Sequence, residues 1–168
     1  FVADMAATTH YKSKVTMGDM GDRRWFLENA WPRQIMRNNL FLNTGTPRFM
    51  EAAFLCGLAG TDWSWAVKLA DLDNDSRVDV YVTNGASRMI TDADITVTPQ
   101  MLVGKTEWEL WKTQPTMKEV NLAFRNKGDL QFENTPKPLV LAPDGISHAA
   151  AHGALDGPRH RPPAATPL

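Results

Sequence analysis

The sequence predicts an all-β fold, a partial β-propeller whose blades are separated by partly helical excursions. Three observations lead to this class. Short β-branched and aromatic runs alternate with turn residues. A long internal repeat divides the chain into similar units. Each unit holds four short strand patterns, which is the number in a propeller blade. The 168 residues, 43% of them apolar, are enough for the core of one ordinary domain.

The repeat appears when the sequence is shifted by 83 residues without gaps. Residues 21–73 then share 15 identities with residues 104–156. Many of the identities involve rarely used residue types: Trp25/Trp108, Pro32/Pro115, Phe41/Phe124, Gly45/Gly128 and Phe49/Phe132. At a slightly shorter offset, FVADM (1–5) matches YVTNG (81–85). We therefore expect the chain to begin at the end of one unit, to contain a complete unit, and to run into another.

Residues 38–85 are expected to form a complete blade. NLFLNTG (39–45) is a short strand closed by a glycine turn, and RFMEAA (48–53) is its hairpin partner. SWAVKLADLD (64–73) alternates as a third strand would. VDVYVTN (78–84) is β-branched and aromatic throughout, and it is the strongest strand pattern in the chain.

The remaining segments are assigned from the same repeat. They are the end of a preceding blade (1–5), two excursions (6–37 and 86–120), a second, incomplete blade (121–157) and a tail (158–168). The excursions contain the helix-like stretch RRWFLENA and a capping-box spacing from Thr116 to Glu119. We expect their tryptophans to pack the excursions onto the sheet, with an aromatic platform for a ligand as the alternative: Trp25, Trp31, Trp108 and Trp111.

An acidic loop, DLDNDSRVD, lies between the third and fourth predicted strands. Its carboxylates at Asp71, Asp73, Asp75 and Asp79 would repel one another strongly without a cation. A Ca²⁺ ion takes six to eight oxygen ligands, and alternating aspartates in a tight loop can point several carboxylates inward. The backbone carbonyl of Arg77 can add a further ligand. The spacing therefore predicts a site for a hard divalent cation.

Two other metal sites are disfavoured by the sequence. An EF-hand needs a glutamate at the twelfth loop position and a helix on each side, but Val82 stands there within a predicted strand. Zinc sites need clustered cysteine or histidine. His148 and His152 are spaced as HAAAH, without the glutamate of a metalloprotease helix, and we expect them to have structural or incidental roles.

Taken together, NNLFLNTG, RFMEAA, GLAG and WSWAVKLADLDNDSRVDVYVTNG resemble the FG-GAP/VCBS repeat. The resemblance is to bacterial proteins related to cartilage acidic protein, which often carry an ASPIC/UnbV domain. It covers residues 38–85 strongly and 121–157 more weakly. It implies an integrin-α-like β-propeller with calcium in D-x-D-x-D-G-x-x-D loops. The ligands it implies here are Asp71, Asp73, Asp75, the carbonyl of Arg77, and Asp79.

The chain departs from this family pattern at two places. Ser76 stands where the family loop has glycine, which adopts a positive φ without strain, so calcium affinity is expected to be reduced. In the second unit only Asp156 remains of the loop. The sequence PRHRPPAATPL follows, and its prolines cannot build a central strand. We predict a disordered, aberrant tail over 158–168 without a metal, of the kind that a shifted reading frame would produce.

Composition narrows the function classes. A net charge of −1 gives no field that favours nucleic acid or an anionic membrane surface, and no apolar run is long enough to span a bilayer. Cys56 lies in the apolar stretch AAFLCGLAG and is expected to be buried. No catalytic constellation stands out. The resemblance to the FG-GAP/VCBS repeat implies a secreted, periplasmic or cell-surface module for adhesion, ligand binding or scaffolding, without catalytic activity. Such a module would bind Ca²⁺ and a protein or glycan ligand, and it would pack against the remaining blades of its parent chain. The alternative is the propeller portion of a secreted enzyme acting on polysaccharide.

Overall fold

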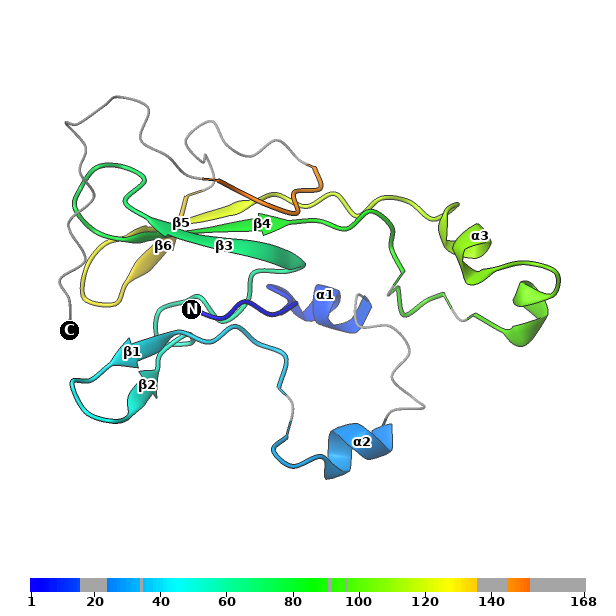
Figure 1. Ribbon diagram of the computed structural model, residues 1–168, viewed down its shortest axis with the longest axis horizontal. Helices are drawn as coiled ribbons and strands as arrows, with labels where there is room; N and C mark the ends of the chain where they lie inside the picture. The colour runs from blue at the N-terminus through cyan, green and yellow to red at the C-terminus, as the bar shows by residue number, and fades with distance from the viewer. Residues whose placement is uncertain (16–23, 34, 91, 96, 136–144, 152–168) are drawn as a thin grey trace.

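The computed structural model describes residues 1–15, 24–33, 35–90, 92–95, 97–135 and 145–151 (Figure 1). Its strands form two antiparallel sheets. One is the hairpin of β1 (Phe41–Asn43) and β2 (Phe49–Glu51). The other has the order β3-β4-β5-β6, with β3 at Ser64–Ala70, β4 at Asp79–Asn84, β5 at Leu122–Asn126 and β6 at Phe132–Asn134. The helices are short: α1 (His10–Val15), α2 (Arg24–Asn29), the 3-10 helix η2 (Pro99–Leu102) and α3 (Glu107–Trp111).

The all-β class predicted from the sequence is confirmed at this level. Each of the four predicted strand patterns contains an observed strand: 39–45, 48–53, 64–73 and 78–84. The observed strands are one to four residues shorter than the patterns. The two sheets are open, and the described part of the chain shows neither a closed barrel nor a propeller.

The four strands predicted for residues 38–85 do not form one sheet. β3 and β4 pair with each other, and β4 pairs on its other edge with β5, whose register places Val82 opposite Leu122. The hairpin β1–β2 lies below this sheet in Figure 1. The connection from β2 to β3 carries the buried residues Ala53, Cys56 and Leu58, so it is part of the core rather than a tight turn between neighbouring strands.

The hairpins β1–β2 and β5–β6 have the same register at an offset of 83 residues. Asn43 lies opposite Phe49 in the first hairpin, and Asn126 lies opposite Phe132 in the second. Each turn is closed in the same way, because the asparagine Oδ1 accepts a hydrogen bond from the glycine two residues later. These distances are 2.8 Å to Gly45 N and 2.9 Å to Gly128 N. Both glycines have positive φ values, of 71° and 84°, which explains the preference for glycine there.

The equivalence extends to the strand that precedes each hairpin. Val2 forms an antiparallel bridge with Asn39, as Val82 does with Leu122. A buried asparagine holds each junction. Asp4 N donates to Oδ1 of Asn38 at 2.8 Å, and Asn84 N donates to Oδ1 of Asn121 at 2.8 Å. Residues 1–4, β1 and β2 therefore repeat the arrangement of β4, β5 and β6.

The core lies between the four-stranded sheet and the β2–β3 connection. All six residues of β4 are buried, because it is a central strand with both edges paired and both faces covered. Its Val80 and Val82 pack with Phe124 of β5 and with Cys56 and Leu58 of the connection. Cys56 is a buried free thiol, as predicted, and burial raises its pKa, with a smaller contribution from the charge of Glu51.

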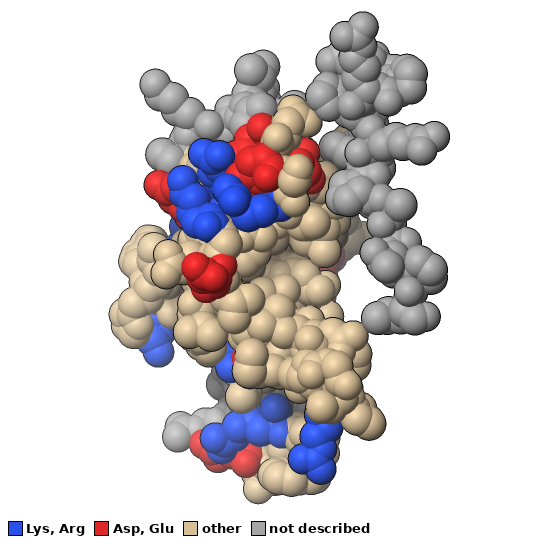
Figure 2. Space-filling view, turned by 90° about the vertical axis from the view of Figure 1, so that its left-hand side faces the viewer, with Lys and Arg blue, Asp and Glu red and all other residues tan. Residues whose placement is uncertain are grey.

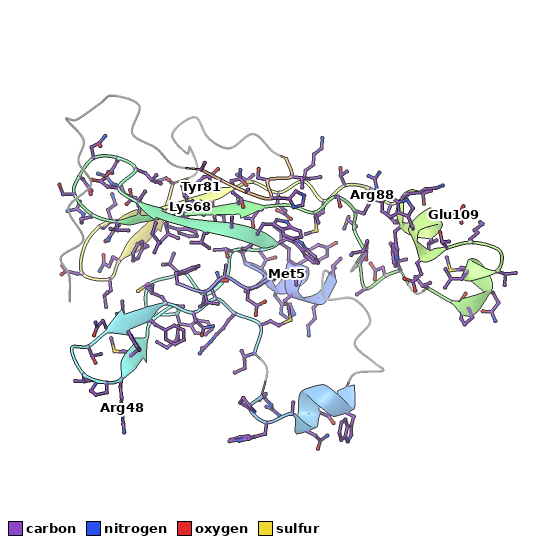
Figure 3. All side chains as sticks on the ribbon, in the orientation of Figure 1. Met5, Arg48, Lys68, Tyr81, Arg88 and Glu109 are labelled. Atoms are coloured by element: carbon purple, nitrogen blue, oxygen red, sulfur yellow. The ribbon has the colours of Figure 1, made fainter. Side chains whose placement is uncertain are left out.

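The helices lie in the two excursions, where the sequence placed helical stretches. α2 coincides with the RRWFLENA stretch. The capping box was predicted at the wrong place: it is formed by Thr106 and Glu109 at the start of α3, ten residues earlier in the chain, whereas Thr116 and Glu119 lie outside any helix. In Figure 3, Lys68 and Tyr81 lie on the sheet, opposite each other in β3 and β4, while Glu109 lies far out in the excursion.

The predicted packing of the excursion tryptophans is wrong for three of the four. Trp25, Trp31 and Trp108 are exposed by 74%, 94% and 65%, respectively. The two helices that carry Trp25 and Trp108, α2 and α3, project from the sheet in different directions in Figure 1. Since short helices standing away from a sheet have little surface to bury against it, their aromatic side chains face outward.

The first excursion is attached to the sheet region by charge. The Lys12 amine on α1 contacts Oδ2 of Asp62 at 2.9 Å and Oε2 of Glu119 at 2.8 Å. Burial alone would lower the pKa of Lys12, but these two carboxylates outweigh it and hold the pKa above its ordinary value. No helix among the described residues is long and apolar enough to cross a membrane. The predicted tail at 158–168 lies outside the described residues, as does His152.

Candidate metal centre

The acidic loop is the connection between β3 and β4. Asp71 directly follows the last residue of β3, and Asp79 is the first residue of β4. The two strands are antiparallel neighbours, and Ala70 lies opposite Asp79. The loop therefore returns on itself and brings its first and last carboxylates together at one end of the sheet. Val82 lies three residues into β4, in agreement with the exclusion of an EF-hand.

Three of the predicted ligands form one group. Asp71, Asp73 and Asp79 each offer a carboxylate oxygen, and these atoms all lie within 4.8 Å of one another. Two oxygens bound to the same Ca²⁺ at about 2.3–2.6 Å can be at most about 5 Å apart. The spacing of the three carboxylates therefore fits a single ion, and all three ligand atoms are the hard oxygens that Ca²⁺ prefers.

Two members of the group are held in place by backbone donors. Asp71 accepts hydrogen bonds from Asp75 N at 3.0 Å and Ser76 N at 2.8 Å, which close the loop. Asp79 is only 2% exposed, and its oxygens accept from Leu72 N and Asn126 N, both at 2.8 Å. Their orientation thus depends on the loop and on β5, and not on a bound ion.

The third member, Asp73, has no such support. Both of its carboxylate oxygens are buried, and neither accepts a hydrogen bond from any residue that the structure describes. Oδ2 meets Nε of Arg125 in an ion pair that lacks hydrogen-bond geometry. A buried carboxylate without donors is costly. This orphaned pair of oxygens is the strongest indication that the loop is shaped for a cation.

Asp75, which was also predicted as a ligand, is not part of the group. Its carboxylate contacts the Arg77 guanidinium at 2.6 Å and that of Arg125 at 3.4 Å, and it accepts from Arg77 N at 2.9 Å. Partial burial alone would raise the pKa of Asp75, but the Arg77 backbone donor and the two arginines outweigh it and lower the pKa. The role predicted for the Arg77 carbonyl stays a prediction.

Sequence reasoning missed two residues of β5 that complete the site, Arg125 and Asn126. Asn126 donates through its backbone to Asp79 and through Nδ2 to Val78 O at 3.0 Å, while its carbonyl accepts from Arg77 Nε at 2.9 Å. The repeat had marked Asn126 as the partner of Asn43, but that signal concerns the hairpin turn. Contact with a loop almost 50 residues earlier leaves no local pattern in the sequence.

Charges of both signs gather at this end of the molecule. Figure 2 looks onto the end that is on the left in Figure 1, and it shows acidic and basic side chains side by side above a mostly neutral surface. The β3–β4 loop and the β5–β6 hairpin contain the ion pairs Asp73–Arg125, Asp75–Arg77 and Lys127–Glu133. The acidic loop is therefore partly neutralised by arginines from within the protein.

Replacing Ser76 by glycine is expected to stabilise the loop. Ser76 has a φ of 66°, in the left-handed region that costs a non-glycine residue about 1–2 kcal/mol. Part of the gain is offset by the greater entropy of glycine in the unfolded chain, so Ser76→Gly should add about 0.5–1 kcal/mol, measured by denaturant unfolding. Asn74→Gly is the matched control. Asn74 has a φ of 59°, which asparagine tolerates, so a gain as large as that of Ser76→Gly would argue against relief of strain.

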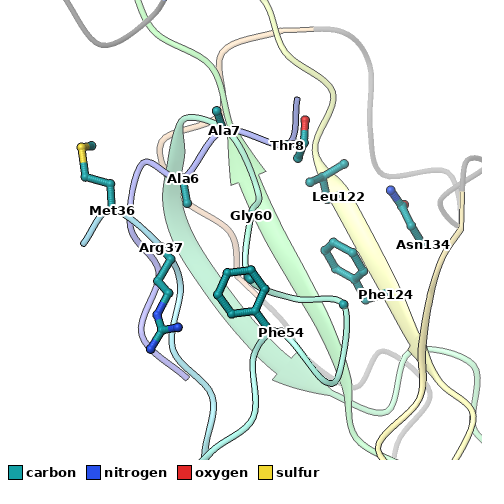
Figure 4. A pocket seen from close by; sticks show the side chains of 12 residues that line it. Ala6, Ala7, Thr8, Met36, Arg37, Phe54, Gly60, Leu122, Phe124 and Asn134 are labelled. Carbon is teal, nitrogen blue, oxygen red and sulfur yellow. The ribbon is translucent and has the colours of Figure 1, made fainter. Parts of the chain in front are cut away.

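A separate hollow of about 470 Å³ lies between the N-terminal segment, the β2–β3 connection and β5 (Figure 4). Of the described residues that line it, only Arg37 is ionisable, and its guanidinium lies 5.3 Å from the centre of the Phe54 ring. The hollow does not include the acidic loop. Its described lining offers apolar surface and the guanidinium of Arg37.

His148 has a structural contact. Its ring meets that of Trp65 edge-on, with centroids 4.6 Å apart. Among the described residues, the group that could hold a metal does not include His148.

Comparison with known proteins adds no assignment: no family model, no curated protein and no solved structure matches the chain. The function is therefore inferred from the site and the fold of the chain itself. They define an open, antiparallel β-sheet protein with a three-carboxylate group at one end of the sheet.

Proposed function

We propose that this chain is part of a calcium-stabilised β-propeller of the FG-GAP/VCBS kind, and that it serves outside the cytoplasm as a binding or scaffold module without catalytic activity. The observation that carries the proposal is the loop between β3 and β4, which brings Asp71, Asp73 and Asp79 together and leaves both Asp73 oxygens without a hydrogen bond.

The shared geometry of the two hairpins supports the repeat part of the proposal. Residues 1–4, β1 and β2 repeat the pairing of β4, β5 and β6, down to the asparagine that holds each junction. Independent strands would have no reason to share both a register and a turn. Repetition of a four-stranded unit is how propellers are built.

In this proposal the ion has a structural role. A bound Ca²⁺ would supply positive charge among three carboxylates that otherwise repel one another. The backbone orients two of the carboxylates: Leu72 N and Asn126 N donate hydrogen bonds to Asp79, and the N–H groups of residues 75 and 76 donate to Asp71. The site would thereby fasten the end of β3 to the start of β4 and to the neighbouring strand β5.

Calorimetric titration of the metal-free chain with Ca²⁺ tests the proposal directly. We expect saturable binding that Asp73→Ala abolishes, because Asp73 contributes the oxygens that have no other donor. Asp94→Ala is the control, since Asp94 is an exposed acid in the excursion away from the group. Absence of binding at millimolar Ca²⁺, or equal binding by Asp73→Ala, would contradict a calcium site in this loop.

A secreted enzyme acting on polysaccharide is the second candidate, and one observation favours it. Trp25, Trp31 and Trp108 are exposed, and aromatic side chains are common contacts for sugars and other ligands. A glycan array combined with an activity screen separates the two functions. Binding without turnover supports the module, and turnover supports the enzyme.

A further inference from the structure

Arg125 is the immediate neighbour of the acidic group, and it contacts Asp73, the member of the group that accepts no hydrogen bond from the described part of the chain. Its Nε forms an ion pair with Oδ2 of Asp73, and its Nη2 lies 3.4 Å from Oδ2 of Asp75. Asp71 and Asp79, in contrast, are satisfied by backbone N–H groups. A cation that enters the group and the guanidinium of Arg125 therefore use the same Asp73 oxygens.

We infer that Arg125 is an internal competitor of the metal at this site, and that it sets the calcium affinity by neutralising Asp73 when no ion is bound. The inference rests on the proposed calcium site. When Ca²⁺ binds, Asp73 exchanges its ion pair for the metal, and the guanidinium keeps two other acidic neighbours. One is Asp75, and the other is Glu133, its cross-strand partner in β6.

Two effects of Arg125 act in the same direction. Its charge lies beside the group and repels an incoming cation. Its ion pair with Asp73 must also be broken before that carboxylate can turn to the metal. Removing the guanidinium should therefore strengthen calcium binding, even though Arg125 makes favourable contacts in the protein without metal.

The repeat supplies a substitution that the fold already accepts. The residue equivalent to Arg125 in the β1–β2 hairpin is Leu42, which lies opposite Met50 just as Arg125 lies opposite Glu133. Arg125→Leu thus gives the β5–β6 hairpin the same side chain that the β1–β2 hairpin carries at this position. Lys127→Thr is the matched control. It removes a positive charge from the same hairpin and introduces the threonine that stands at the equivalent position, Thr44. It also removes the ion pair with Glu133.

The experiment is calorimetric titration with CaCl₂ of the unmodified chain, Arg125→Leu and Lys127→Thr. We expect Arg125→Leu to bind about fivefold more tightly, the upper range for a half-exposed ion pair, and Lys127→Thr to stay within about twofold. Arg125→Gln removes the charge but keeps a polar side chain. If the leucine variant does not fold, the glutamine variant should also bind Ca²⁺ more tightly than the unmodified chain.

Every outcome is informative. Binding by the unmodified chain with no gain in the Arg125 variants would overturn the competition and leave the calcium site standing. Binding by the Arg125 variants alone would support the competition, because the arginine would then block the site completely, but it would contradict the proposal that the unmodified chain is stabilised by calcium. If no variant binds Ca²⁺, both the calcium site and the competition are wrong. An equal gain for Lys127→Thr would show a general charge effect and would also overturn the inference.

Discussion

Removal of calcium is expected to lower the melting temperature of this protein by about 5–10 °C. A ligand that binds only the folded state stabilises it by RT ln(1 + [L]/Kd), which is about 2.7 kcal/mol when the free ion is at 100 times its Kd. For a chain of this length, each kcal/mol shifts the midpoint by about 2–4 °C. Thermal unfolding followed by circular dichroism, with excess Ca²⁺ and then with excess chelator, measures the difference.

Asp73→Ala should reproduce the effect of the chelator. In excess Ca²⁺ its melting temperature is expected to match that of the unmodified chain in chelator, and further chelator should not change it. The reason is that Asp73 is the member of the group whose oxygens have no other hydrogen-bond donor. Asp94→Ala, in the excursion, should keep the full response. If the unmodified chain gives the same melting curve in excess Ca²⁺ and in chelator, calcium has no structural role in this protein.

Asp79→Ala is expected to destabilise the protein by about 3 kcal/mol even without calcium. The Asp79 carboxylate is 2% exposed and accepts hydrogen bonds from Leu72 N and Asn126 N. Its removal leaves two N–H groups unpaired at the junction of the loop with β4 and β5, at a cost of about 1–3 kcal/mol each. Urea unfolding in chelator gives the free energy of unfolding for both proteins.

The contrast with Asp73→Ala makes this prediction specific. In chelator, Asp73→Ala removes a buried carboxylate that has no hydrogen bonds and only the Arg125 ion pair, so its cost should stay below about 1 kcal/mol. The two neighbouring aspartates should therefore differ by about 2 kcal/mol without metal. Equal losses for the two variants would mean that the Asp79 hydrogen bonds contribute little to the fold.

The hairpin equivalence also bears on how the molecule is assembled. The sequence predicts a complete blade over residues 38–85, but the four-stranded sheet takes β3 and β4 from that stretch and β5 and β6 from the predicted second blade. Each hairpin is thus joined to the strand that precedes the excursion, Val2 in one case and Val82 in the other. A substitution in a hairpin should consequently also affect the pairing of that hairpin with the strand of the preceding unit.

The sequence alone determined the strands, the acidic loop and the buried cysteine. These features are visible because their signals are local. A β-branched run such as 78–84 favours a strand, and a loop that joins two antiparallel neighbouring strands brings its first and last residues, Asp71 and Asp79, close together. The positive φ at Ser76 agrees with the glycine that the FG-GAP/VCBS loop pattern has at this position.

The tertiary structure decided which strands share a sheet, which aspartates share a site, and which side chains neutralise them. Asp75 belongs to the same local pattern as Asp73, yet it turns to Arg77 and Arg125. Arg125 and Asn126 reach the loop from almost 50 residues away, on a strand brought alongside by pairing with β4. Charge and hydrogen-bond partners depend on distance in space, which spacing along the chain does not specify.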